Sequence, residues 1–220
     1  MRSVAFAERD LATVLCIGAH CDDIEIGCGG TLLTLAGRHP ALHFHWVIFS
    51  GDAVREAESR AAAAALLGAR CTVVVHRFRG SYLPWEGAAV KDEFEATARR
   101  LQPDLVFTHH LADRHQDHRL LAELTWNTFR DHAVLEYEIP KYEGDLGHPN
   151  LYVTLAAATA TRKADMLMDS FPSQHSRTWF SRELFLGHLR VRGTECNAPS
   201  GYAEAFHARK LVWQDPEVAS

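Results

Sequence analysis

Apolar runs alternate with amphipathic stretches along most of this chain. The runs are rich in β-branched and aromatic residues and have the length of buried strands, about four to eight residues. We predict strands at residues 14–18, 43–50, 71–75, 105–109, 134–137 and 151–155. Helices are predicted between them, at residues 31–37, 54–67, 91–101, 117–129 and 160–170. This alternation favours an α/β fold with a doubly wound, mainly parallel, Rossmann-like sheet.

Two parts of the chain do not follow this pattern. Residues 27–30, Gly-Cys-Gly-Gly, predict a turn after the first strand, and Thr31 can cap the helix that follows. Beyond Phe171 the periodicity weakens, so we expect a tail packed around the sheet. The chain shows no repeat, linker or low-complexity segment, which indicates a single domain over residues 1–220.

Two clusters of ionisable side chains come directly after predicted strands. If those strands are parallel neighbours, both clusters lie at the same carboxyl edge of the sheet and can meet. Histidine and carboxylate ligands with one open coordination position are typical of catalytic zinc. The sequence therefore predicts a metal site in two halves. The first half contains His20, Asp22 and Asp23, and the second contains His115, Asp117 and His118.

The spacing suggests roles for some of these residues. His20 and Asp23 are close enough in the chain for a sharp turn to aim both at one ion, which leaves Asp22 free to handle protons. His115 and His118 are three residues apart and fall on one face of a helical turn. Only one of them is needed as a further ligand, and the spacing does not decide which.

Simpler interpretations of both clusters stay open. Asp22 and Asp23 could do no more than cap the following helix, since carboxylates are favoured at helix N-termini. The second cluster could be a charged helix start with incidental histidines, although Asp117 is placed to accept a ring N–H from a neighbouring histidine. The glycines of residues 27–30 lack the third glycine of a dinucleotide fingerprint, so they are weak evidence for a nucleotide site.

Composition narrows the classes of function. The chain has 23 Lys and Arg against 28 Asp and Glu, a net charge of −5, and no basic block, so nucleic acid is not an expected partner. No apolar stretch approaches the ~20 residues that span a membrane, and the charged segment 1–10 is not expected to be a signal peptide. Five cysteines without a C-x-x-C pair argue against a disulfide framework, and a cytoplasmic location is expected.

Several segments resemble the LmbE/PIG-L zinc-dependent N-acetylglucosaminyl deacetylases. Residues 19–25, Ala-His-Cys-Asp-Asp-Ile-Glu, are similar to that family's A-H-P-D-D-x-E, and residues 115–118, His-Gln-Asp-His, to its H-x-D-H. The resemblance spans roughly residues 14–207. Weaker similarities to R-x-x-E, S-Q and Y-A-E-x-F segments occur at Arg55 with Glu58, at Ser173 with Gln174, and at residues 201–206.

The resemblance implies a role for each candidate residue. Zinc lowers the pKa of bound water and polarises an amide carbonyl, while a carboxylate within hydrogen-bond reach takes the proton. By the resemblance, His20, Asp23 and His118 bind zinc, Asp22 is the general base, His115 oriented by Asp117 stabilises the oxyanion or protonates the amine, and Arg55 contacts the substrate.

Cys21 departs from the family pattern, which has proline at this position. The turn thereby loses a fixed φ and gains a soft potential ligand. A fourth protein ligand would close the coordination position that a catalytic zinc needs open. Because successive side chains of an extended turn point in different directions, we expect Cys21 to pack against the turn and stay away from the metal.

The expected function is a zinc hydrolase that removes the acetyl group from the nitrogen of an amino-sugar-containing small molecule. Two alternatives stay open: a zinc amidase acting on another N-acyl or thiol-conjugate substrate, and a non-catalytic sugar- or nucleotide-binding α/β module. The sequence names neither the substrate nor the oligomeric state, monomer or homo-oligomer. Loops 80–87 and 140–149 are expected to form pocket walls, where Tyr82, Trp85 and Tyr142 could stack on a sugar ring.

Overall fold

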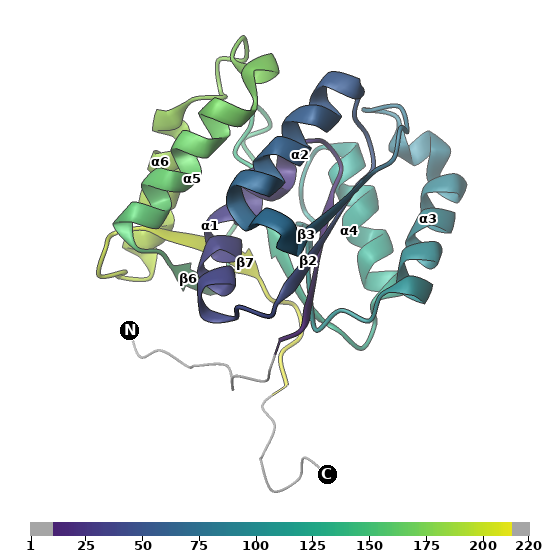
Figure 1. Ribbon diagram of the computed structural model, residues 1–220, viewed down its shortest axis with the longest axis horizontal. Helices are drawn as coiled ribbons and strands as arrows, with labels where there is room; N and C mark the ends of the chain where they lie inside the picture. The colour runs from purple at the N-terminus through teal and green to yellow at the C-terminus, as the bar shows by residue number, and fades with distance from the viewer. Residues whose placement is uncertain (1–10, 213–220) are drawn as a thin grey trace, which may run out of the picture.

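The structure is a computed structural model and describes residues 11–212. One seven-stranded sheet lies between two layers of helices (Figure 1). The segment 1–10, which is not expected to be a signal peptide, lies outside the described residues. The strands are β1 Thr13–Gly18, β2 His43–Ile48, β3 Cys71–Val75, β4 Leu105–His109, β5 Ala133–Tyr137, β6 Leu151–Thr154 and β7 Ala203–His207. The helices are α1 Asp23–Arg38, α2 Ala53–Leu67, α3 Gly87–Arg100, α4 Gln116–Thr128, α5 Ala157–Ser170 and α6 Arg182–Glu195.

The sheet has the strand order β3-β2-β1-β4-β5-β7-β6. The pairs from β3 through β5 are all parallel, whereas β7 runs antiparallel to both β5 and β6. The predicted α/β fold with a mainly parallel sheet is therefore confirmed. After β1 the chain moves outward to β2 and β3, then returns to β4 on the other side of β1. Such a reversal between β1 and β4 opens a crevice at the carboxyl ends of the strands, where ligands bind in this class of fold.

Each face of the sheet carries its own apolar core. Val14 and Cys16 of β1 belong to the layer that packs under α1, α2, α5 and α6, whereas Leu15 and Ile17 belong to the layer under α3 and α4. Figure 1 shows these two groups of helices on opposite sides of the sheet. Parallel strands covered on both faces have nearly continuous apolar sequences. This double burial is the reason why the strands could be predicted from their apolar runs.

The turn predicted at residues 27–30 is wrong, because these residues lie inside α1. Its glycines serve close packing instead of a change in chain direction. A Cβ atom on Gly27 would lie 2.2 Å from Cδ2 of Tyr137, and one on Gly30 would lie 2.6 Å from Cδ1 of Leu155. Thr31 is buried in the middle of the helix and does not cap it. The small residues let α1 approach β5 and the chain after β6 directly.

The tail predicted beyond Phe171 is also wrong, since this region contains α6 and β7. Strand β7 lies within the sheet, between β5 and β6. It buries a carboxylate, Glu204, which forms an ion pair with Lys163 of α5 at 2.5 Å. Glu204 also accepts hydrogen bonds from the backbone N–H groups of Gly30, at 2.8 Å, and Thr31, at 2.6 Å. A charged residue in the strand interrupts the apolar pattern, which explains why the prediction failed here.

Candidate metal and catalytic site

The two predicted halves of the site meet at the crevice between β1 and β4. These strands are parallel neighbours, and His20 and Asp23 follow β1 while His118 lies in the first turn of α4 after β4. Nδ1 of His20 lies 3.2 Å from Nε2 of His118 and 3.3 Å from Oδ2 of Asp23. The third distance, from Nε2 of His118 to Oδ2 of Asp23, is 3.6 Å. A tetrahedral zinc site with bonds of about 2.0–2.1 Å separates its ligand atoms by about 3.3 Å, so the three atoms fit such a site.

Each of the two histidines has a carboxylate behind it. Nε2 of His20 lies 3.3 Å from Oδ2 of Asp117, and Nδ1 of His118 lies 2.9 Å from Oδ2 of Asp113. The pKa values of both carboxyls lie below their usual range, since hydrogen bonds from these histidines outweigh the effect of burial. Ionised carboxylates only accept, so each ring nitrogen facing one carries the proton. The opposite nitrogens lie 3.2 Å apart. Once Nδ1 of His20 gives up its proton, both would offer lone pairs to a cation held between them.

The carboxylate of Asp117 was expected to orient the ring of His115, and the structure shows a different arrangement. The carboxylate of Asp117 accepts from the backbone N–H groups of Ser81, at 2.6 Å, and Leu83, at 3.1 Å, in addition to the ring of His20. Its contact with His115 is through the main chain, where the Asp117 N–H donates to Nδ1 of His115 at 3.3 Å. The side chain of Asp117 thus orients His20, and the expectation that this carboxylate orients His115 is corrected.

Asp113 is a further site residue that the sequence reasoning missed. In addition to the ring of His118, it accepts from the backbone N–H of His115 at 2.8 Å and from the ammonium group of Lys141 at 2.9 Å. Its position two residues before the H-x-D-H segment was the available signal. The aspartate that supports the second histidine is therefore Asp113.

Asp22 lies beside the three candidate ligands and forms an ion pair with Arg55. Its Oδ1 is 2.9 Å from Nη2 of Arg55, which also donates to the carbonyl oxygen of Cys21 at 2.8 Å. Burial raises the pKa of Asp22 to about 6, although the guanidinium of Arg55 opposes this rise. Nε of Arg55 is 3.8 Å from Glu58, so the Arg55–Glu58 pair is the weaker of the two contacts. Arg55 contacts the candidate base, a link that the sequence did not suggest.

The charges around the candidate ligands favour a cation. Burial would lower the pKa of His20, but the nearby carboxylates, Asp23 first, outweigh it and raise the value to about 10. Without a metal His20 is therefore an imidazolium, and a bound cation would take the place of its second proton. Burial would raise the pKa of Asp23, but the surrounding histidines hold it well below its usual value. His118 differs, because burial lowers its pKa to about 3. His118 is therefore a neutral imidazole, the form that binds a metal.

Cys21 stays away from this centre, as expected. Its side chain is 1% exposed, its Sγ lies 3.6 Å from the carbonyl oxygen of Ser50, and a Cβ on Gly51 would come within 2.5 Å of the sulfur. Burial raises the pKa of the Cys21 thiol to about 12. Within residues 11–212, two groups of side chains lie close enough together to hold a metal, His20 with His115 and His118, and Asp23 with His109 and His118. Neither contains a cysteine.

His109 is a buried histidine that the sequence reasoning passed over. Its Nε2 accepts from the backbone N–H of Ala19 at 3.0 Å and lies 3.2 Å from Oδ2 of Asp23. The ring stacks on His118 with centroids 3.9 Å apart. His109 forms a compact group of potential ligand atoms with Asp23 and His118. Because Nε2 of His109 is engaged by Ala19, we regard His109 as packing support for His118; its place at the end of β4 was the available signal.

A cleft of about 230 Å³ opens beside the candidate ligands. The loop at residues 140–149 forms part of its wall, as predicted, and includes Tyr142. In contrast, Tyr82 and Trp85 of loop 80–87 are not among the lining residues. That loop contributes backbone donors to Asp117 instead. The other wall comes from the region that was expected to be a tail, through Gln174, Arg177 and Trp179.

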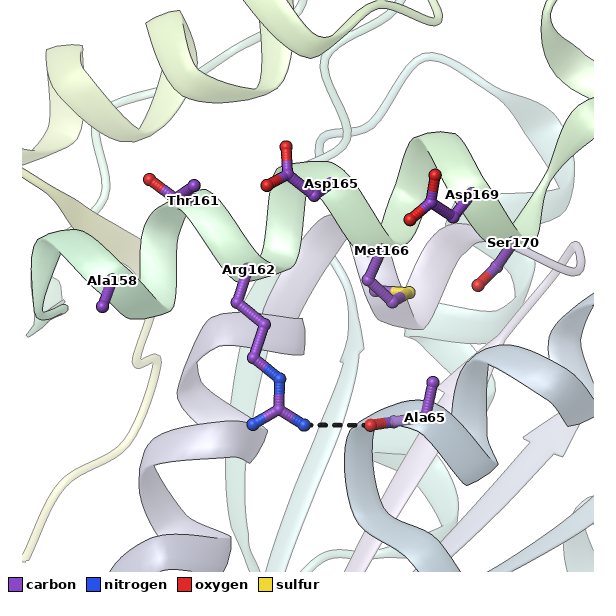
Figure 2. A pocket seen from close by; sticks show the side chains of 8 residues that line it. All are labelled: Ala65, Ala158, Thr161, Arg162, Asp165, Met166, Asp169 and Ser170. Carbon is purple, nitrogen blue, oxygen red and sulfur yellow. Dashed lines mark hydrogen bonds between the residues drawn. The ribbon is translucent and has the colours of Figure 1, made fainter.

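A second hollow lies on the outer surface of α2 and α5, away from the site residues. Figure 2 shows Arg162 of α5 reaching toward α2, where it donates to the carbonyl oxygen of Ala65 at 2.9 Å. Asp165 and Asp169 also line this hollow, but Asp165 forms an ion pair with Arg182. It contains none of the candidate ligands, and the chemistry therefore belongs to the cleft at the sheet edge.

Comparison with known proteins agrees with this location. The family model described as PIG-L, GlcNAc-PI de-N-acetylase, matches residues 15–129, which contain both halves of the site. N,N'-diacetylchitobiose deacetylase from Pyrococcus horikoshii is 22% identical, with a TM-score of 0.70 over 90% of this chain and 84% of that one. The zinc-inhibited form of teicoplanin deacetylase Orf2 is 15% identical, with a TM-score of 0.69 over 88% and 96%. The 4-carboxy-2-hydroxymuconate hydratase of Pseudomonas putida is 18% identical, with a TM-score of 0.75 over 93% and 99%. At these identities the solved structures show a shared fold.

Proposed function

Because this chain belongs to the PIG-L family, we propose that it is a zinc-dependent hydrolase that removes an N-acetyl group from an amino-sugar-containing small molecule. The products would be acetate and a free amine. One observation carries the proposal: three ligand atoms 3.2–3.6 Å apart, with a separate buried carboxylate, Asp22, beside them. A binding module without catalysis has no need of that additional carboxylate.

We assign the metal to His20, Asp23 and His118. Asp117 and Asp113 accept the ring protons on the far sides of the two imidazoles, as outer carboxylates do for zinc-bound histidines. Nδ1 of His20 would lose its proton when the metal binds. Three protein ligands leave a fourth position open, as catalytic zinc requires. A zinc ion bound there would acidify water and polarise the amide carbonyl.

The side chains around these ligands supply the proton transfers. Asp22 would accept the proton of the attacking water, and its pKa of about 6 suits a base that works near neutral pH. His115 accepts the Asp117 N–H at Nδ1, so in its neutral form Nε2 carries the ring proton. Burial, followed by the charge of His20, lowers the pKa of His115. Neutral His115 is thus suited to donate a hydrogen bond from Nε2 to the developing oxyanion. The proton that Asp22 takes from water would pass to the leaving amine, either directly or through His115 once that ring has itself been protonated.

The choice of an N-acetylated sugar rests on the family and on the cleft. Aromatic Tyr142 and Trp179 line it together with Arg55, Gln174 and Arg177, and such a mixture can stack on a sugar ring and bind its hydroxyl groups. The same fold also occurs in a hydratase, so the fold alone does not select the reaction. The family description, a de-N-acetylase, favours amide hydrolysis. A zinc amidase acting on another N-acyl or thiol-conjugate substrate is the alternative.

Partners and location stay predictions. No helix within residues 11–212 is long and apolar enough to cross a membrane. We propose a small-molecule substrate, no nucleic-acid partner and a cytoplasmic location, and we propose one domain over the whole chain.

The proposal is tested by a mass-spectrometric screen of zinc-loaded protein against N-acetylated sugars, N-acyl amino acids and thiol conjugates. We expect an N-acetylated sugar to lose its acetyl group, with one acetate released per amine formed. His118→Ala is the control and should bind sharply less zinc and release no acetate. Release from a thiol conjugate alone would favour the amidase alternative. Addition of water to an unsaturated acid without release of acetate would contradict the proposal.

A further inference from the structure

The loop at residues 140–149 is joined to the second half of the site by a buried ammonium group. Nζ of Lys141 lies 2.9 Å from Oδ2 of Asp113 and 2.9 Å from both carboxylate oxygens of Asp145. The side chains of these three residues are 8%, 3% and 5% exposed. Asp113 belongs to the segment that holds His118, whereas Asp145 belongs to the loop.

Each carboxylate also accepts hydrogen bonds that do not involve Lys141. Asp113 already accepts from the backbone N–H of His115 and the ring of His118. Asp145 accepts from the backbone N–H of Arg114 at 2.7 Å. Two carboxylates that share one cation would repel each other in its absence. Burial would lower the pKa of Lys141, but Asp113 and Asp145 outweigh burial and raise it, so the group stays charged.

The residues next to Lys141 form one wall of the cleft. Lys141 itself lines the cleft together with Tyr142 and Glu143, and the hydroxyl of Tyr142 lies 2.9 Å from that of Thr178. Thr178 stands between Arg177 and Trp179, which line the opposite wall. The contact between Tyr142 and Thr178 therefore connects the two walls.

We propose that Lys141 is a positioning residue, which fixes loop 140–149 against the segment of His118 and thereby sets the shape of the substrate cleft. The expected effect of Lys141 on catalysis rests on the proposed function, whereas the docking of the loop is independent of that function. Lys141 acts through Asp113 and Asp145, and it touches neither the candidate ligands nor the base.

The test compares Lys141→Met with Lys141→Arg, and Lys91→Met is the matched control. Lys91 of α3 pairs with Glu95 and Thr128, away from the loop. Docking is read from cleavage after Glu143 by an endoproteinase specific for glutamate, with fragments 1–143 and 144–220 identified by mass spectrometry. In Lys141→Met we expect cleavage at least about tenfold faster, because a buried carboxylate pair loses its counter-ion. Lys141→Arg should restore most of the protection, since a guanidinium also bridges two carboxylates.

Kinetics separate positioning from a general loss of stability. Lys141→Met should raise KM by about tenfold or more, while kcat falls by less than about threefold and zinc content is unchanged. This result is expected because the substitution moves the cleft wall and leaves the reacting groups in place. If Lys141→Met does not fold, Asp145→Asn should give the same two changes in smaller degree. Unchanged cleavage and KM, or a fall in kcat alone, would overturn the inference. If the wild-type protein deacetylates no substrate, the proposed function fails and the cleavage experiment still decides the docking.

Discussion

Glu25 of α1 gives a prediction that does not depend on the substrate. Its side chain is fully buried, Oε1 accepts from the hydroxyl of Ser59 at 3.2 Å, and Oε2 has no partner among the described residues. Burial, with the charges of Asp22 and Asp23 adding to it, raises the pKa of Glu25 from 4.5 to about 8. The folded protein therefore holds a proton that the unfolded chain releases above pH 4.5.

The sign of the effect on stability follows from this proton. Between pH 4.5 and about 8 the folded state binds more protons at Glu25 than the unfolded state does. The free energy of unfolding should fall as pH rises, by up to about 1.4 kcal/mol per pH unit. From pH 5 to pH 8 the loss attributable to Glu25 is about 3–4 kcal/mol. The contribution is fully present below pH 4.5 and is lost as pH passes about 8.

Glu25→Gln isolates the contribution of Glu25 to the pH dependence of stability, because glutamine has nearly the same shape and no charge. Urea unfolding followed by circular dichroism, in the presence of a chelator, measures the free energy of unfolding without a contribution from zinc binding. At pH 5 the variant should be more stable than the wild type by about 1 kcal/mol at most, and at pH 8 by about 4 kcal/mol. Parallel curves for the two proteins across this range would refute the reasoning, since they would mean that Glu25 is ionised in the folded state.

Three further predictions concern the site. Asp22→Asn should retain zinc and lose about 10²- to 10⁴-fold in kcat, as expected for a general base, and near-normal turnover would assign the base elsewhere. Arg55→Met removes the cation 2.9 Å from Asp22, so the pKa of Asp22 should rise above about 6. The acid limb of the pH profile of kcat/KM should then move up by about 1–3 pH units. If the limb does not move and KM rises, Arg55 acts as a substrate contact alone. Cys21→Ser and Cys21→Pro should both retain stoichiometric zinc by metal analysis, and loss of zinc in Cys21→Ser would place sulfur in the coordination shell.

The parallel part of the fold and both halves of the site could be predicted because their signals are local. Each strand from β1 to β5 is an apolar run, and His20, Asp23 and His118 come soon after two of these strands. Adjacency of β1 and β4 then brings the halves together. The packing of α1 could not be predicted in the same way. Gly27 leaves room for the ring of Tyr137, a residue far away in the chain.

The remaining errors also concern contacts between distant segments. The buried Glu204 makes β7 unlike a core strand until Lys163 is placed beside it. Which carboxylate supports which histidine depends on the angle at which α4 starts, so spacing alone did not connect Asp117 to His20. The cleft wall at Gln174 and Trp179 comes from a segment with no periodic pattern, and only the tertiary structure brings it to the site.

The central claim is that this chain hydrolyses an N-acetyl group with zinc held by His20, Asp23 and His118. The most direct test is a zinc titration of metal-free protein, with acetate release measured on the best substrate from the screen. We predict that activity rises with added zinc and reaches its maximum at about one zinc per chain, as expected for one three-ligand site. Acetate release that is equally fast without zinc, or that needs a second zinc per chain, would contradict the account.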